Sequence, residues 1–166
     1  MAKITFKDVD RYRQFLDRYA DQMAQGEVLK KAVAAGAKPV ADAIRRNLNA
    51  LPVVKFRRLR SGETFTGLSA SQKKDLARGF GLAPIKRDMD GGTNTKAGFH
   101  GYGRYPTKSY PQGVPNALTA RSVESGSSVR IKTPFVRPAV NKTRRSAVKA
   151  MGKVIDTATE SIYNRR

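Results

Sequence analysis

The sequence has no cysteine, a single histidine and only 13 acidic side chains among its 166 residues. Without cysteine the chain can form neither disulfides nor thiolate metal sites, so the fold must rest on packing, which suits a protein made in a reducing cytoplasm. No stretch approaches the roughly 20 apolar residues that a membrane-spanning helix needs, and residues 1–15 lack the apolar core of a signal peptide. We therefore expect one soluble domain with no membrane partner and no export through a signal peptide.

Basic side chains greatly outnumber the acidic ones: 33 Lys and Arg against 13 Asp and Glu give a net charge of +20. Residues 91–166 carry most of this excess, with 14 basic and three acidic side chains. Such self-repulsion is usually offset by a polyanion nearby, which means nucleic acid or the acidic face of another protein. A simpler alternative, that the charge only keeps the protein soluble, stays open.

Side chains that usually carry catalysis are also scarce. His100 has no cysteine to complete a zinc site and no carboxylate close in sequence to orient it as a base. The sequence contains no phosphate-binding loop motif. One catalytic alternative stays open, in which Asp88, Asp90 and Glu124 meet around Mg²⁺ as in a nuclease. We expect no enzymatic activity, no cofactor and no metal.

Apolar residues recur at helical spacing in three segments. Residues 6–24 are predicted to form an amphipathic helix that stops near Gly26. A second helix is predicted over residues 27–49, with a kink or break near Pro39. A last helix is predicted from Pro138 to Tyr163. Proline suits its first turn, because backbone N–H groups there have no partner within the helix and proline has no N–H to leave unpaired.

Short strands are predicted between these helices. One pair is Arg78–Leu82 and Thr95–Phe99, with turn residues at Asp90-Gly91-Gly92, and a second pair is Ser122–Val123 and Val129–Lys132. The expected fold class is α+β: N-terminal helices and a small, mostly antiparallel β-sheet with a long arm, packed on a C-terminal helix.

The arm is the stretch of about residues 101–117, which is rich in Gly, Pro and Tyr. A structureless loop of this length is uncommon in a compact domain and is usually functional or ordered by a partner. We therefore predict an assembly arm, with Tyr102, Tyr105 and Tyr110 as its contact residues.

Two basic segments are candidates for contact with DNA or with a partner protein. The first is the run at residues 55–60, which contains Lys55, Arg57, Arg58 and Arg60. It can neutralise phosphates, but a single ring, Phe56, is no stacking platform for bases. The second is the polar side of the last helix, represented by Arg144 and Arg145. The sequence favours neither DNA nor a neighbouring subunit as the partner.

Two ordered motifs carry a resemblance to a known family. They are Val123-Glu124-Ser125-Gly126-Ser127-Ser128 and Thr133-Pro134-Phe135-Val136-Arg137-Pro138-Ala139, preceded by a Gly-rich segment at residues 91–102. Together they resemble the neck and tail-completion proteins of tailed bacteriophages and prophages, also called tail-component proteins. The resemblance covers about residues 27–163, so residues 1–26 look like an added helical extension to a single domain at 27–166.

Each motif residue has a physical reason to be present. Gly126 permits the positive φ of a tight reversal after the strand predicted at Ser122–Val123. Pro134 holds the residue before it extended, and Phe135 can pack between the sheet and the last helix. Arg137 is poorly placed for the dipole at a helix start, which suggests a fixed partner such as Glu124. Val123 and Pro138 complete the set of motif and interface residues.

The resemblance implies a structural protein of the virion, located at the head–tail junction after assembly in the host cytoplasm. It implies a ring, expected to be hexameric, around the DNA channel. Its neighbours would be head-closure or adaptor proteins and tail-terminator or tail-tube proteins, with non-specific contact to packaged double-stranded DNA. The alternatives are a tail-terminator or tail-tube protein of the same virion, and a basic non-specific nucleic-acid-binding protein.

Overall fold

The computed structural model describes residues 6–55 and 62–164, with the side chains of 6–10 and 23–25 left out. This part of the chain forms helices and short strands in an α+β fold, as expected from the sequence. In chain order the elements are α1 (Phe6–Gln25), α2 (Glu27–Ala50), α3 (Ala70–Gly79), β1 (Phe80–Leu82), β2 (Lys86–Arg87), β3 (Thr93–Asn94), β4 (Ala97–Phe99), α4 (Asn116–Ser125) and α5 (Val136–Asn164).

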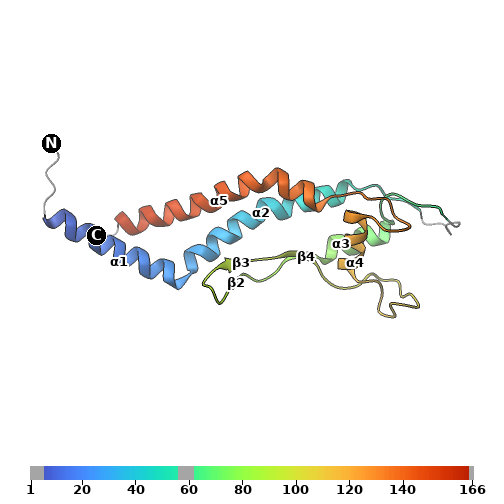
Figure 1. Ribbon diagram of the computed structural model, residues 1–166, viewed down its shortest axis with the longest axis horizontal. Helices are drawn as coiled ribbons and strands as arrows, with labels where there is room; N and C mark the ends of the chain where they lie inside the picture. The colour runs from blue at the N-terminus through green and yellow to red at the C-terminus, as the bar shows by residue number, and fades with distance from the viewer. Residues whose placement is uncertain (1–5, 56–61, 165–166) are drawn as a thin grey trace.

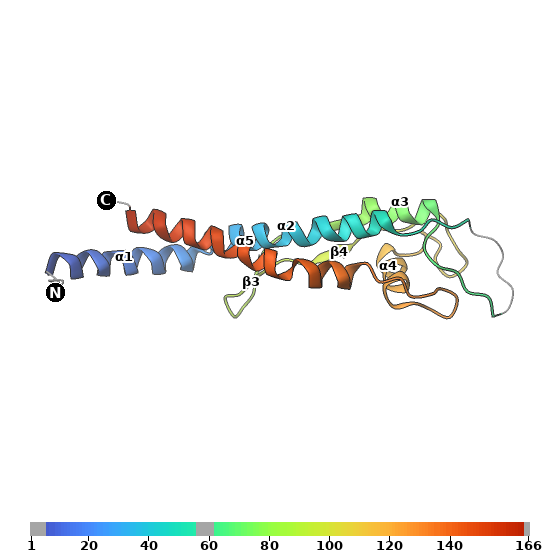
Figure 2. The ribbon, with the colours of Figure 1, turned by 90° about the horizontal axis from the view of Figure 1, so that it is seen from above.

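The two longest helices, α2 and α5, form the body of an elongated molecule. They lie side by side and run in opposite directions, and the start of α1 and the end of α5 lie at the same end of the molecule (Figures 1 and 2). The break expected near Pro39 is not formed, because α2 continues from Glu27 to Ala50. Buried residues on both sides of Pro39, among them Gly36 and Ile44, attach the helix to its neighbours, so packing outweighs the lost backbone hydrogen bond.

The helix pair depends on close approach at Gly36. A Cβ atom at this position would lie 2.5 Å from Cγ of Met151 and 3.3 Å from the carbonyl oxygen of Ala147, both on α5. Gly152, also on α5, has nothing within 4 Å of the corresponding position.

These two glycines give a matched test of the helix packing. Gly36→Ala should lower the free energy of unfolding by about 1–3 kcal/mol, because the added methyl group overpacks the contact. Gly152→Ala should raise it by about 0.5–1 kcal/mol through the higher helix propensity of alanine. Chemical denaturation of both variants measures the difference. Equal effects of the two substitutions would contradict the close contact at Gly36.

The strands form two small antiparallel sheets. Strand β1 pairs with β4, with Phe80 opposite Phe99, and β2 pairs with β3 through a turn in which Gly91 has a φ of 78°. The predicted strands at Arg78–Leu82 and Thr95–Phe99 are therefore confirmed in their second halves. Strands β1 and β3 pack on α2, with β3 beside the middle of the elongated molecule, and β4 packs on α3 and α4, which lie toward the end away from the start of α1 (Figure 1).

The predicted strand at Ser122–Val123 is wrong. These residues lie in α4, whose buried residues Asn116, Thr119, Ala120 and Val123 have helical spacing. The prediction weighed the two residues Ser122 and Val123 more heavily than the helical periodicity of the whole segment 116–125. The strand predicted at Val129–Lys132 is reduced to a single bridge between Arg130 and Phe65. Backbone hydrogen bonds join Phe65 to Val129 at 3.0 Å and Ile131 to Phe65 at 2.8 Å. The buried Arg130 side chain adds a hydrogen bond to the Gly67 carbonyl oxygen at 3.0 Å.

Candidate functional site

The two sequence motifs meet at a joint between α4 and α5. The Glu124 carboxylate, near the end of α4, accepts hydrogen bonds from three successive backbone N–H groups at the start of α5: Phe135 at 2.7 Å, Val136 at 2.8 Å and Arg137 at 2.9 Å. The next residue, Pro138, has no N–H to satisfy. One carboxylate and one proline therefore account for the backbone donors that a helix start leaves without partners.

Electrostatics at this joint favour the ionised carboxylate. Partial burial by itself raises the pKa of Glu124. The backbone N–H groups of Val136, Phe135 and Arg137, together with the positive charge of the Arg137 guanidinium, outweigh this effect and hold the pKa below its ordinary value. The suspected partnership of Arg137 with Glu124 is thus formed through the backbone N–H, and the side-chain charge assists it.

The remaining motif residues have the roles expected of them, with one correction. Gly126 has a φ of 82°, but the reversal follows helix α4 and not a strand. Phe135 is 1% exposed, and its ring lies edge-on to Phe99 at 5.8 Å; the Phe99 ring in turn lies 5.1 Å from that of Phe80. The Thr133 N–H donates to the Val123 carbonyl oxygen at 2.8 Å, which fixes the segment before Pro134. The motifs therefore form a structural joint between α4, α5 and the sheet.

The arm is held at its base and exposed beyond it. Its two ends meet where the Gly103 N–H donates to the Val114 carbonyl oxygen at 2.9 Å, and its tip is closed by a bridge between Thr107 and Tyr110. Tyr102 and Tyr105 are 52% and 65% exposed, and Tyr110 is 38% exposed. The predicted contact residues are therefore all accessible on a single copy of the chain.

An ion pair between a buried carboxylate and a partly exposed arginine fastens this arm to α3. Asp75, whose side chain is 3% exposed, accepts from the Arg104 backbone N–H at 3.1 Å and pairs with the Arg104 guanidinium at 3.3 Å. Arg78 adds a longer contact at 3.6 Å. Sequence reasoning missed this latch, because its residues are 29 positions apart and no local pattern connects them. It makes the arm a fixed projection at its base.

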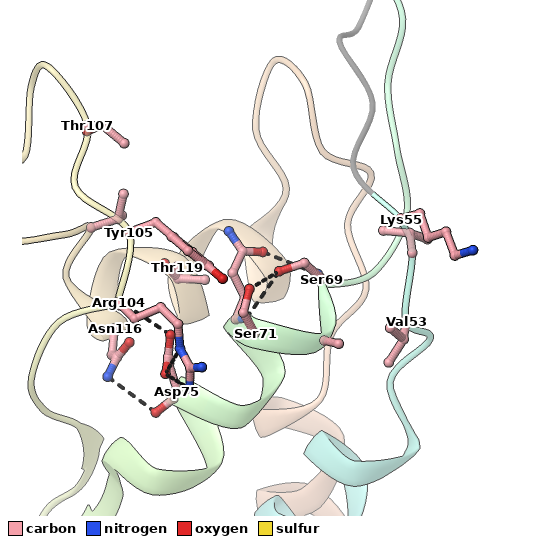
Figure 3. Close-up of a pocket in the computed structure, with 15 residues that line it drawn as sticks. Val53, Lys55, Ser69, Ser71, Asp75, Arg104, Tyr105, Thr107, Asn116 and Thr119 are labelled. Carbon is pink, nitrogen blue, oxygen red and sulfur yellow. Dashed lines mark hydrogen bonds and ion pairs between the residues drawn. The ribbon is translucent and has the colours of Figure 1, made fainter.

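Next to the latch lies a pocket of about 740 Å³ between the arm, the start of α3, helix α4 and residues 53–55. Figure 3 shows Asp75 and Arg104 directed toward each other in this region, while the Lys55 amine points away from them. Apolar parts of the lining come from Val53, Val54, Tyr105 and Val114. Val53 is 53% exposed, so the pocket offers apolar surface that a single chain leaves uncovered.

The carboxylate in the pocket lining is engaged in the latch. The Asp75 carboxylate is occupied by Arg104, and His100 is an exposed residue whose carbonyl oxygen accepts from the Asn116 amide at 2.8 Å. Within residues 6–55 and 62–164 no three His, Cys, Asp or Glu side chains are grouped as metal ligands. Asp88, Asp90 and Glu124 therefore do not form the nuclease-like site considered above. No helix in the described part of the chain is long and apolar enough to cross a membrane.

The basic candidates are divided between described and undescribed segments. Lys55 is exposed at the edge of the pocket, whereas Arg57, Arg58 and Arg60 lie outside the described residues. Arg144 and Arg145 are both exposed on α5. The structure thus leaves the charge of α5 available to a partner.

A further exposed surface lies where α1 meets the end of α5. The Phe15 ring packs edge-on to Tyr163 at 5.5 Å, and Arg11 lies 5.7 Å from the Tyr163 ring centre. We call the outer part of this contact the aromatic end; its members are Tyr12, Leu16 and Tyr163, which are 58%, 44% and 51% exposed. The sequence predicted this amphipathic first helix, but it did not predict that part of the apolar side of the helix stays exposed in a single copy of the chain.

Comparisons of this chain with protein-family models, with curated proteins and with solved structures give no match, so the phage-neck resemblance stays a prediction carried by the motifs alone.

Proposed function

We propose that this protein is a structural subunit of the head–tail junction of a tailed bacteriophage, where it forms a ring with copies of itself. The observation that supports this most directly is the exposure of large apolar side chains in two separate places. One is the aromatic end of α1 and α5, and the other is the arm with its neighbouring pocket. Exposed apolar surface of this kind marks protein–protein contacts.

The positions of the two surfaces favour a ring over a simple dimer. The aromatic end lies at one end of the elongated body, and α3, α4 and the arm lie toward the other (Figure 1). When one surface of a copy binds a different surface of the next copy, the contact repeats until the rotation closes. The expected sixfold symmetry comes from the family resemblance and not from this geometry.

In this role the chain acts mechanically and carries no catalytic activity. The ring would join head-closure or adaptor proteins to tail-terminator or tail-tube proteins around the DNA channel, after subunits are made in the host cytoplasm. A tail-terminator or tail-tube role in the same virion would use the same two surfaces. The joint at Glu124 and the latch at Asp75 would keep the contact surfaces in fixed relative positions.

A second candidate is a basic nucleic-acid-binding protein, which the net charge of +20 favours. The two candidates differ in what the apolar surfaces do. A free-standing DNA-binding protein has no need of the exposed aromatic end, whereas a ring subunit must cover it.

Self-association tests the proposal. The purified protein should form oligomers in sedimentation analysis, or should co-sediment with isolated heads or tails if the ring requires its neighbours. A variant with serine at Tyr12 and Leu16 should lose this association, because its apolar contact area is removed. Met89→Ser is the matched control, since Met89 is a fully exposed apolar side chain on the β2–β3 turn, outside both surfaces. A parent protein that is monomeric and binds neither heads nor tails would contradict the proposal.

A further inference from the structure

Helix α5 carries a row of basic residues on the side that faces away from the molecule. Its buried residues, Ala139, Thr143 and Ile162, define the packing side. The basic stripe, which we define as Lys142, Arg145, Lys149 and Lys153, has spacings of three, four and four residues. At 3.6 residues per turn this places all four residues on one side of the helix, about opposite the packing side, over roughly 16 Å.

All four members of the basic stripe are exposed, and no acidic side chain among the described residues is paired with them. None forms an ion pair with another described residue, although α5 itself contains Asp156 and Glu160. Both acidic residues continue the same row toward the end of the helix, at three and seven positions beyond Lys153. The outer side of α5 is therefore positive over its middle turns and negative in its last turns.

The composition of this side identifies the kind of ligand. The positions between the basic residues on the same side are Asn141, Ser146 and Gly152, so the stripe contains neither an apolar anchor nor an aromatic ring. Protein interfaces are depleted in lysine and are built around apolar or aromatic anchors. Binding of single strands requires rings on which bases can stack. A row of ammonium and guanidinium groups without either feature suits a regular array of phosphates.

We propose that the basic stripe of α5 binds the phosphate backbone of double-stranded nucleic acid without reading its sequence. This inference rests on the proposed function and deepens it, since it names the surface of the ring subunit that contacts packaged DNA. Asp156 and Glu160 limit the footprint, because their carboxylates repel phosphates beyond the last basic residue.

Arg144 lies on a different side of the helix from its neighbour Arg145. Consecutive residues are about 100° apart around a helix, so Arg144 shares its side with Val140 and Val148, four positions before and after it. Those two valines are 40% and 62% exposed. Arginine between exposed apolar residues is typical of a protein contact, so the two arginines predicted together belong to separate surfaces.

Measurement of duplex binding at several salt concentrations tests the basic stripe. The parent protein should bind 20-base-pair DNA duplexes of unrelated sequence with equal affinity, and the logarithm of the affinity should fall steeply with the logarithm of salt concentration. Replacing all four stripe residues by glutamine should make that slope shallower by about three to four. The matched control replaces Lys74, Lys96, Lys108 and Lys132, four exposed lysines elsewhere, by glutamine. It removes the same charge and should change the slope by less than about one.

Several outcomes would overturn the inference. They are equal slopes for the two variants, no duplex binding by the parent, a preference of about a thousandfold for one sequence, or equal competition by polyglutamate, which would assign the stripe to an acidic protein. Sedimentation of the same samples separates this inference from the proposed function. A parent that assembles without binding DNA refutes only the DNA contact, and one that binds DNA through the stripe without assembling refutes only the ring.

Discussion

Replacing Phe135 by alanine should lower the free energy of unfolding by about 3–5 kcal/mol. Phe135 is among the largest fully buried side chains, and its ring contacts Phe99 where α5 meets the sheet. The substitution removes buried apolar surface and leaves a cavity, because the surrounding core can relax only partly into the space of the lost ring. A loss of this size is comparable to the whole stability of a marginal domain, so assembly should fail together with folding.

Chemical denaturation of the purified variant measures this effect, and Tyr105→Ala serves as the control. Tyr105 is also aromatic but 65% exposed, so its removal should change the stability by less than about 0.5 kcal/mol. The two substitutions separate the core from the arm, because Tyr105→Ala should affect assembly alone. An unfolding free energy of Phe135→Ala within about 1 kcal/mol of the parent would show that the ring contributes little to the core.

Replacing Glu124 by alanine should lower the free energy of unfolding by about 2–4 kcal/mol. The variant loses three hydrogen bonds to an ionised group and leaves partly buried N–H groups at the start of α5 without a partner. Glu124→Gln should cost less, because an amide oxygen can still accept at least one of these bonds. Glu160→Gln on the exposed side of α5 is the control and should have an effect within about 0.5 kcal/mol.

The contribution of Glu124 should also depend on pH in a defined direction. Because folding lowers the pKa of this carboxyl, its stabilising effect is complete above the ordinary value of 4.5 and is lost as the pH falls through the lower value of the folded protein. The stability difference between the parent and Glu124→Gln should therefore be constant near neutral pH and shrink as the pH falls below 4.5. A difference that is unchanged in acid would contradict the ionised carboxylate at the helix start.

The joint at Glu124 explains why two separate motifs occur together in the sequence. Glu124 is useful only if the start of α5 reaches it, and Gly126 and Pro134 shape the connecting loop to allow that. Phe135 then fixes the same helix start against the sheet. We infer that such motifs maintain the fold and that partners bind on other surfaces: copies of the chain on the aromatic end and the arm, and DNA on the basic stripe.

The sequence by itself determined the long helices, the β1–β4 pair and the exposed arm. Helical periodicity over 20 or more residues is a strong local signal, and a Gly- and Pro-rich stretch between helices has few alternatives. It also indicated the buried role of Phe135 and the positive φ of Gly126, since both follow from the chemistry of single residues. The strand expected at Ser122–Val123 was wrong because two residues carry too little periodicity to outweigh a helical face that spans α4.

Only the tertiary structure decided how distant residues meet. The continuity of α2 through Pro39 depends on packing around it, and the latch between Asp75 and Arg104 joins segments with no shared local pattern. The division of Arg144 and Arg145 between two surfaces required knowledge of which side of α5 is buried. Each of these features rests on contacts between elements, and their free energies depend on distances in space that no local pattern of residues encodes.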